Sequence, residues 1–338
     1  MRSASILQRN QRRDDTLKSG VELTLREFVR SEAKTLPLPG AGETRRRFEV
    51  LASWAAVDLS VGRLAEGHSD AIAILAEAGM EPQNPDATYG VWAARMRQGG
   101  VTATSTNDGW LLSGSKPFCS GSNTLDRALV VAETVQGSRI FDVAVHQQVV
   151  SVHPESWAAV GMADSNSTTL DFGGPPIPSD QVVGPANFYT SRCGFWFGAA
   201  GVAACWYGGA VGLVQALLES IGDDPNGHVL SDLGVAIAGV QCMHDVLHEV
   251  ADQIDRNPRD SSDHARFSAL VARQVIHDRA LDVLNLVGAA GGARPLCLDR
   301  AQSRRAADLF VYLSQHHGGS DSADIGRLAK EEWDAANR

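Results

Sequence analysis

The stretch GWLLSGSKPFCSGSNTLDRALVVA, residues 109–132, carries the pattern that decides the fold. Apolar runs bounded by Gly, Asn and Asp are typical of β-hairpins, and alternation along a strand points side chains to opposite faces. The pattern predicts a strand at 110–113, a tight Ser-Gly turn, a second strand opening on Lys116, and a third strand at 128–132. One face of such a sheet can meet a ligand while the other meets the core.

Composition and charge limit the class of protein. A chain of 338 residues predicts two or three domains, and its shares of apolar residues (43%) and charged residues (21%) are ordinary for a globular protein. The net charge of −10 argues against a nucleic-acid partner, because phosphate binding uses clustered Lys and Arg. The basic run at 45–47 is interpreted as a solvated helix face.

Membrane, secretory and metal-binding signals are not found in the sequence. No unbroken apolar stretch approaches the roughly 20 residues that span a bilayer, and the most apolar region, 195–218, is predicted to be a helix buried inside the protein. Residues 1–15 have no apolar core, so we expect no signal peptide and a cytoplasmic location. The five cysteines are scattered without C-x-x-C or His pairing, so neither a metal site nor a disulfide framework is expected.

Hydrophobic periodicity divides the chain into three parts. Helical spacing from 21 to 79 is followed by many short strands and, after Pro185, by four long helices. Within the first part, Glu66 and His68 are interpreted as a helix cap and a solvated polar pair. The predicted strands lie at 89–93, 101–105, 110–113, 128–132, 140–145, 151–153 and 168–172, and the predicted long helices lie at 190–221, 230–256, 262–287 and 299–316. The predicted domains are an N-terminal helical domain (1–86), a middle β-domain (87–187) and a C-terminal helical bundle (188–338).

Two stretches together resemble the acyl-CoA dehydrogenase family. Residues 109–132 resemble the middle β-domain of the family, whose pattern is roughly G-x-x-L-x-G-x-K-x-W-x-T-x-G. Residues 160–184, VGMADSNSTTLDFGGPPIPSDQVVG, resemble its later strand with a V-P-x-x-x-L-L-G ending. The resemblance implies an α+β multidomain fold with N-terminal helices, a middle β-barrel or sandwich, and a C-terminal four-helix bundle.

The resemblance also implies that the protein binds FAD. In the family, the aromatic and hydroxyl residues of the K-x-W-x-T pattern contact the flavin, and these positions fall on Phe118 and Ser120. A flat aromatic cofactor needs an apolar face and a polar group near its reactive nitrogen, so these residue types are suitable. The alternative interpretation is that Phe118 belongs to the core and Ser120 to a turn.

A glycine-rich loop at 288–292 resembles the family loop through which a neighbouring subunit approaches the FAD diphosphate. Gly291 and Gly292 are the candidate contacts, because glycine permits close backbone approach, and Arg304 and Arg305 could add positive charge. The alternative is a plain turn between helices. Because the family completes its flavin site across a subunit interface, the resemblance implies a homodimer or homotetramer.

The chain departs from the family where dehydrogenases carry their catalytic glutamate. The stretch RRAADLFVYLSQHHGG, residues 304–319, aligns Asp308 with a family aspartate and places the base position on His316, or on His317 if the register shifts by one. Histidine can accept a proton near neutral pH. Flavin-dependent monooxygenases of the same fold resemble this sequence in having a Ser at the hydroxyl position and a His in this place. The alternative is that the histidines end a helix, where imidazole suits the negative end of the dipole.

Two family features are missing. The flavin-contacting T-E-x-x-x-G-S-D loop is replaced by WAARMRQGG, residues 92–100, and the diphosphate-gripping Arg and Phe-Gly pair is replaced by residues 223–228. These departures weaken the case for FAD and weigh against recognition of coenzyme A.

Three functions are therefore considered. The first is an FAD-dependent oxidoreductase of the acyl-CoA dehydrogenase type, acting on the CH–CH group of a small or carrier-bound acyl substrate and passing electrons to a partner protein. An alternative is a flavin-dependent monooxygenase or oxidase, in which oxygen reoxidises the flavin directly. The third is a binding protein that kept the scaffold but lost catalysis and binds no FAD.

Overall fold

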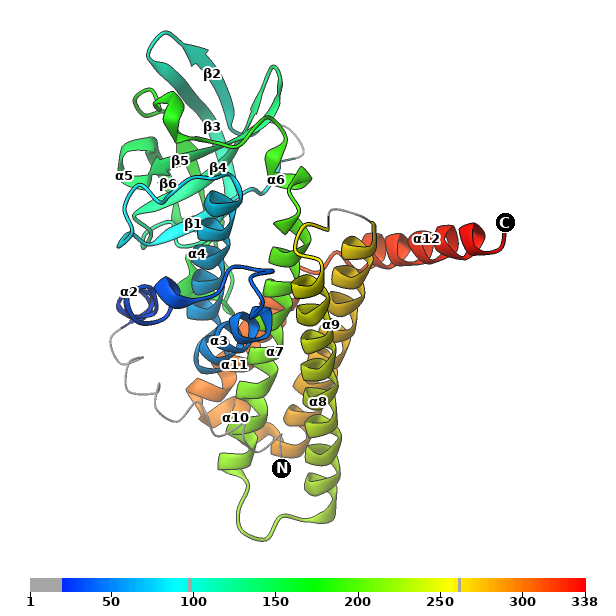
Figure 1. The fold of residues 1–338 in the computed structure, drawn as a ribbon. Helices are drawn as coiled ribbons and strands as arrows, with labels where there is room; N and C mark the ends of the chain where they lie inside the picture. The colour runs from blue at the N-terminus through cyan, green and yellow to red at the C-terminus, as the bar shows by residue number, and fades with distance from the viewer. Residues whose placement is uncertain (1–19, 97–98, 261–262) are drawn as a thin grey trace.

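The computed structural model describes residues 20–96, 99–260 and 263–338. Helices, then a sheet, then helices follow one another along the chain, so the predicted fold class is confirmed (Figure 1). The sheet lies at one end of the molecule and the long C-terminal helices run away from it (Figure 1). The N-terminal helices are α2 (Val21–Ser31), α3 (Thr44–Val57) and α4 (Leu59–Glu77). Residues 1–15, on which the signal-peptide expectation rests, lie outside the described residues.

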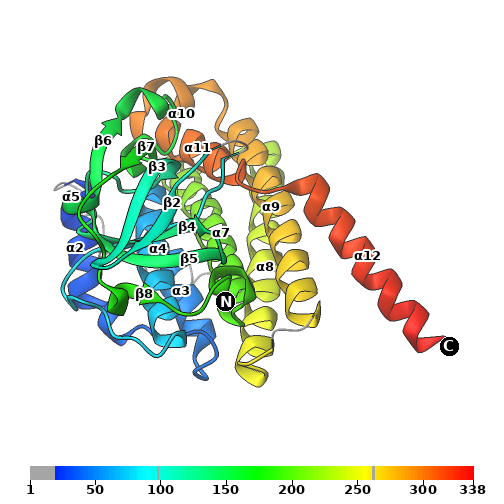
Figure 2. The same ribbon diagram turned by 90° about the horizontal axis from the view of Figure 1, so that it is seen from above.

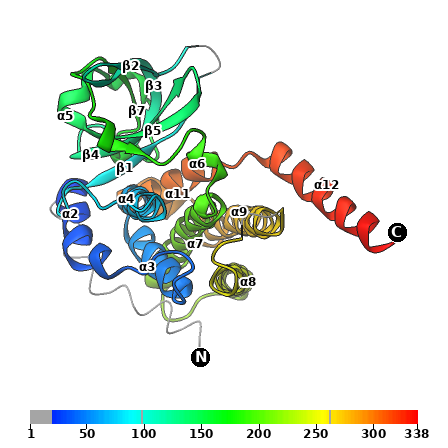
Figure 3. The same ribbon diagram turned by 45° about the horizontal axis from the view of Figure 1, so that its top comes forward.

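Eight strands form one sheet, and in Figure 3 they curve around a shared interior. The strand order is β6-β7-β3-β2-β4-β5-β8, and β1 pairs in parallel with β4. Every predicted strand is present, and β8 is additional. The strands are β1 (Tyr89–Trp92), β2 (Thr102–Thr106), β3 (Gly109–Cys119), β4 (Arg127–Thr134), β5 (Gly137–Ala144), β6 (Val149–His153), β7 (Thr168–Phe172) and β8 (Val182–Val183).

The tight Ser-Gly turn predicted within residues 109–132 is wrong. β3 continues through Ser113 and Gly114, and its first half pairs with β2 while its second half pairs with β7. Gly114 has a φ of +112°, and a Cβ atom there would lie 2.2 Å from the carbonyl oxygen of Gly100. The glycine therefore marks the point at which one long strand changes partners, and not a reversal of the chain.

The C-terminal part is built around a buried helix, as predicted. α7 (Gly194–Ser220) is apolar, and 83% of its most apolar window is covered by the rest of the chain. Figure 2 shows it among the other helices, and Gly208 lets it approach α3 so closely that a Cβ would lie 2.2 Å from Ala52 O. The remaining helices are α6 (Phe188–Ser191), α8 (Gly227–Arg256), α9 (Asp263–Gly291), α10 (Ala293–Leu298), α11 (Arg300–Leu313) and α12 (Gly318–Ala336).

α12 is a helix that the periodicity did not predict. It extends away from the body of the molecule in all three views (Figures 1, 2 and 3), and Leu328 is its one buried residue. Arg266 of α9 pairs with Asp324 and ties α12 to the bundle. The glycines at 318 and 319 are typical of a helix end, which explains why the sequence pattern stopped before them.

Glu66 and His68 are buried, so their interpretation as a cap and solvated polar residues is wrong. Both lie within α4, where the His68 side chain packs beside Phe28 and Tyr89. The backbone N–H of Tyr89 donates to Nδ1 of His68 at 3.1 Å, which joins α4 to the first strand. Burial, with a smaller effect of the Arg47 charge, lowers the pKa of His68 to about 4, so the ring is neutral near pH 7.

This burial predicts a pH-dependent stability. Because the pKa of His68 is lower in the folded protein than its ordinary value of 6.5, the unfolded chain binds more protons between pH 4 and 6.5. The stability that His68 contributes is complete above pH 6.5 and falls as the pH drops toward 4. In His68→Asn the amide oxygen can replace Nδ1 as acceptor without titrating. Urea unfolding at pH 8 and pH 5 should therefore show the wild type losing about 2 kcal/mol more than the variant. Equal losses would contradict a neutral buried ring.

Candidate functional site

β3 ends in the turn that was predicted to contact a flat cofactor. Phe118 has a φ of +56°, a left-handed conformation that is costly for a bulky residue. The residue is 63% exposed, so the alternative interpretation of Phe118 as a core residue is wrong. The turn itself is held firmly, because Trp92 Nε1 donates to Ser120 O at 3.0 Å and Gly121 N donates to Ser165 O at 2.7 Å.

Ser120 begins a line of three buried serine hydroxyls. Its Oγ lies 2.8 Å from Oγ of Ser167, which in turn lies 2.9 Å from Oγ of Ser165. The Ser165 hydroxyl donates to the carbonyl of Met162 at 2.8 Å. Each of the three serines is 8% exposed or less, so water hardly competes for these bonds. The turn after β3 is thereby tied to the loop before β7.

The chemistry of this turn is compatible with the edge of a flavin. An exposed aromatic ring in a strained turn is unfavourable by itself, and a flat ligand would cover it. The neighbouring Ser120 provides a polar group at the border between the exposed Phe118 and the protein interior. Phe118 and Ser120 therefore remain the predicted flavin contacts.

Helix α11, in the helical part of the molecule, contacts the same loop before β7. Asp308 Oδ1 accepts a hydrogen bond from the backbone N–H of Met162 at 2.5 Å. A Cβ on Gly161 would lie 2.0 Å from Ala307 O, so the loop rests directly on the helix backbone. Burial raises the pKa of Asp308, while Met162 N–H and the charge of Arg304 act in the opposite direction.

Arg304, a predicted cofactor contact, binds three carboxylates at this junction. Its guanidinium lies 3.0 Å from Asp58, 2.8 Å from Asp164 and 3.3 Å from Asp308. These residues come from the start of α4, from the loop before β7 and from α11 itself. Burial lowers the pKa of Arg304, but the carboxylates outweigh it and hold that pKa above its ordinary value.

His316 lies just beyond α11, with its ring enclosed among aromatic side chains. Its ring centroid is 4.5 Å from that of His277 and 6.0 Å from that of Trp206, and the side chain is 2% exposed. Burial lowers the pKa of His316, and the nearby His277 and Arg273 lower it further, while Asp321 and Asp278 act in the opposite direction. The neutral imidazole is therefore favoured near pH 7.

The hydrogen bonds of His316 identify which ring nitrogen carries its proton. Gln274 Nε2 lies 3.0 and 2.9 Å from the two carboxylate oxygens of Asp278, so its amide oxygen points the other way. That oxygen lies 3.0 Å from His316 Nε2, which must donate to it. In the neutral ring, Nδ1 then bears the free lone pair. Nδ1 is buried without a hydrogen-bond partner, and the nearest carboxylate oxygen, of Asp321, is 3.5 Å away.

The other predicted site residues lie apart from these. His317 is exposed and precedes the first residue of α12. Gly291 and Gly292 line a hollow of about 260 Å³ between α7, α9 and α10, at the end of the helical domain away from the sheet (Figure 1). Arg305 lines a different hollow, beside Arg304 and the start of α4. Among the described residues, no hydrogen bond or ring contact joins Ser120 to His316.

A buried cluster of polar side chains between α4, α7 and α11 was not predicted from the sequence. Arg63 Nη1 pairs with Glu66 at 2.5 Å, and the Tyr312 hydroxyl lies beside the thiol of Cys205. Burial raises the pKa of Glu66 to about 7, although Arg63 opposes the shift. Spacing of Arg63 and Glu66 by three residues signals an ion pair on a helix, but it cannot tell a buried face from a solvated one.

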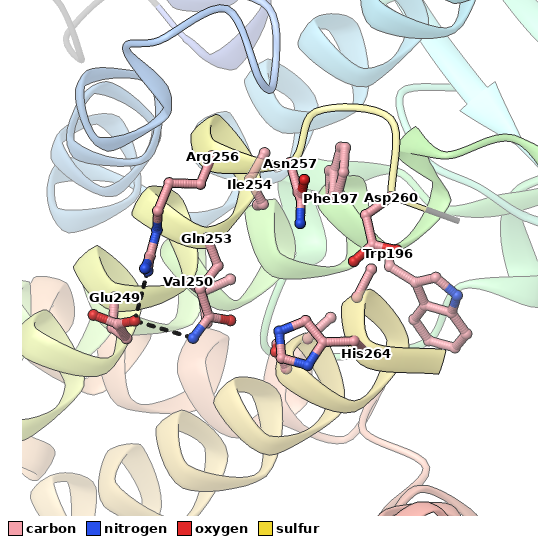
Figure 4. A pocket seen from close by; sticks show the side chains of 13 residues that line it. Trp196, Phe197, Glu249, Val250, Gln253, Ile254, Arg256, Asn257, Asp260 and His264 are labelled. Carbon is pink, nitrogen blue, oxygen red and sulfur yellow. Dashed lines mark hydrogen bonds and ion pairs between the residues drawn. The ribbon is translucent and has the colours of Figure 1, made fainter. Parts of the chain in front are cut away.

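A further hollow, of about 320 Å³, lies between α7, α8 and α9 (Figure 4). Trp196 and His264 face it, together with the end of α8 (Figure 4). The Glu249 carboxylate accepts hydrogen bonds from Arg256 at 3.0 Å and from Gln253 at 3.1 Å. Much of the polar lining of the hollow is therefore already paired. None of the predicted site residues lines this hollow.

Comparison with known proteins finds a partial sequence similarity to a monooxygenase and a fold similar to that of flavin-bound proteins. No family model matches the chain. The dibenzothiophene monooxygenase of Rhodococcus qingshengii is 34% identical over 95 residues, which are 26% of this chain and only 23% of that protein. XiaF from a Streptomyces species, solved with FADH2 and glycerol, superposes with a TM-score of 0.74 at 17% identity over 97% of this chain and 96% of its own. TdsC from Paenibacillus sp. A11-2, solved with FMN and indole, gives 0.73 at 17% identity over 98% and 97%.

These comparisons correct the first predicted function. A dehydrogenase that acts on the CH–CH group of an acyl substrate is wrong, because the sequence relative is a monooxygenase and the similar folds include the flavin-bound XiaF and TdsC. The resemblance to the acyl-CoA dehydrogenase family identified the fold correctly but not the reaction. The sequence signal that pointed to the alternative was the histidine, His316, at the position where the resemblance places the catalytic glutamate.

Proposed function

We propose that the protein is a flavin-dependent monooxygenase. The observation that carries the proposal is the exposed Phe118, held in a strained backbone conformation beside the buried Ser120. The sequence similarity to dibenzothiophene monooxygenase and the fold shared with XiaF and TdsC support it. As the alignment with dibenzothiophene monooxygenase spans 23% of that protein, the proposed activity rests on the site as much as on the similarity.

The reduced flavin would supply the two electrons with which one oxygen atom of O2 enters the substrate and the other forms water. The residues of this chain would bind and orient the ring and keep water away. Phe118 would cover a face of the isoalloxazine, and Ser120 would bind its edge. The buried serines behind Ser120 leave little room for water on the protein side of the ring.

His316 is the proposed proton carrier. Its lowered pKa favours the neutral ring, and its Nδ1 lone pair has no hydrogen-bond partner, so this atom is free to accept a proton. The bond from Nε2 to Gln274 holds the ring in one orientation. His317, exposed at the start of α12, is the second candidate.

The proposed substrate is a small aromatic heterocycle. TdsC has been solved with indole. Around His316 of the present chain, the rings of Trp206, His277 and Tyr312 form a largely aromatic environment. Flat apolar rings are suited to such surroundings because aromatic pairs favour edge-to-face contact.

Removing the Phe118 ring should weaken flavin binding. Phe118→Ala loses the apolar face, so the dissociation constant of reduced flavin should rise about tenfold or more, whereas Phe118→Tyr should bind nearly as the wild type does. Titration with FAD and with FMN, by anaerobic calorimetry, measures both constants. FAD is the proposed cofactor, on the basis of the Gly291–Gly292 turn, and tighter binding of FMN would contradict it. A chain that binds neither flavin would support a binding protein without catalysis.

Replacing His316 should stop oxygenation without preventing flavin binding. His316→Gln keeps a hydrogen-bonding side chain of similar size but cannot carry the proton, so turnover should fall about a hundredfold or more. Protein loaded with reduced flavin is mixed with ¹⁸O2 and with small aromatic heterocycles, beginning with indole, and the labelled product is measured by mass spectrometry. His317→Gln tests the second candidate, and it should keep its activity if His316 carries the proton. Full activity of His316→Gln, or no label in any heterocycle, would count against the mechanism.

We also propose that the protein is a homo-oligomer. The apolar helix α7 offers no surface for an interface, because it is covered within the chain. A better candidate is the groove between α8 and α9, which is lined by apolar residues such as Val235 and Leu286 and has a volume of about 640 Å³. Light scattering should give a mass of two or four times 36.0 kDa, whereas a mass of 36.0 kDa for flavin-loaded protein would refute an oligomer.

A further inference from the structure

The line of three serines has only one self-consistent direction of hydrogen bonding. The carbonyl of Met162 can only accept, so the single hydrogen of the Ser165 hydroxyl points to it. Ser165 Oγ has no second hydrogen, so the Ser167 hydroxyl must donate to it across 2.9 Å. The hydrogen of Ser167 is then used, and the Ser120 hydroxyl must donate to Ser167 across 2.8 Å.

The direction of this line decides what Ser120 can offer a ligand. Its only hydrogen points inward, to Ser167, whereas the lone pairs of its oxygen remain available. No other hydrogen bond of this hydroxyl is present among the described residues. Toward a bound ring, Ser120 is therefore an acceptor.

On the basis of the proposed function, we infer that the serines at 165 and 167 make the site selective for the reduced flavin over the oxidised one, by turning Ser120 into a hydrogen-bond acceptor. Reduction of an isoalloxazine places hydrogens on ring nitrogens that carry lone pairs in the oxidised form. The reduced ring can then donate a hydrogen bond to Ser120. The oxidised ring presents only an acceptor there, so it forms no hydrogen bond with the Ser120 oxygen.

Counting hydrogen bonds gives the size of the preference. Without a flavin, the line has three bonds, from Ser120, Ser167 and Ser165 in turn. A reduced ring adds a fourth bond without changing them. An oxidised ring gains a bond only if Ser120 turns toward it and Ser167 turns toward Ser120, which breaks the bond from Ser167 to Ser165 and leaves the total at three. The difference of one bond corresponds to about tenfold in affinity.

Ser165 and Ser167 are thus positioning residues that act through Ser120. In Ser165→Ala the hydroxyl of Ser167 loses its acceptor and can donate to Ser120, so either flavin then gains one bond. The carbonyl of Met162 stays paired in this variant, because it also accepts from Ser165 N and from Trp157 Nε1, each at 3.1 Å. The variant therefore leaves no unpaired buried carbonyl, and it should fold.

The test is the ratio of the dissociation constant of oxidised FMN or FAD to that of the reduced form, measured for each protein by anaerobic calorimetry with dithionite as reductant. The wild type should bind the reduced form more tightly. Ser165→Ala should lower the ratio about tenfold, mainly by binding the oxidised form better, and Ser167→Ala should act in the same direction. Binding is measured without turnover, so the result does not depend on the substrate.

Ser122→Ala is the matched control. Its hydroxyl is in the same turn, donates to Asn166 O at 2.8 Å and accepts from Thr168 Oγ1 at 2.8 Å, but does not contact Ser120. The ratio should be unchanged in this variant. Flavin binding with the same ratio in the wild type, Ser165→Ala and Ser167→Ala would overturn the role of the serines while leaving the proposed monooxygenase intact. Binding of neither form by the wild type would overturn both.

Discussion

The contact between the loop at 161–167 and helix α11 is the constraint on which the proposed site depends. Asp308 binds the backbone of Met162, and Arg304 binds carboxylates from α4, from the loop and from α11. The same loop supplies the serines behind Ser120, so the helical domain fixes the position of the turn that presents Phe118. Arg304 was predicted as a cofactor contact, and its three carboxylate partners assign it at least a structural role. Loss of one partner from such a partly buried group would leave an unpaired charge, which is costly.

Burial shifts the pKa values of three polar side chains discussed above. His68, Glu66 and His316 all have pKa values shifted toward the neutral form, and in each case burial is the largest cause. For His68 the reason is structural, since the ring accepts the N–H that starts β1. For His316 the ring is held by Gln274 but its second nitrogen is unpaired. A neutral, oriented imidazole with a free lone pair is suited to proton transfer, and this difference distinguishes the two buried histidines.

The comparison with monooxygenases illustrates how fold and reaction separate. The acyl-CoA dehydrogenase resemblance identified the architecture, but one scaffold supports several reactions and the site decides among them. In this chain a histidine, His316, lies where the resemblance places the dehydrogenase glutamate, and the rings of Trp206 and His277 pack beside it. Ser120 occupies the hydroxyl position of the family pattern. What it can offer a ligand depends on the direction in which its hydrogen points.

The sequence by itself determined the order of helices and strands, because apolar periodicity and turn residues act locally: each predicted strand formed, and 195–218 became the buried helix. It also provided Phe118, Ser120 and His316 as candidate site residues, through matches to a known pattern. Only the tertiary structure decided which residues face one another. The continuity of β3 through Gly114, the burial of Glu66 and His68, the three carboxylates around Arg304 and the line from Ser120 to Met162 all arise from segments distant in the chain. Burial and hydrogen-bond direction are set by such long-range contacts, which no local pattern encodes.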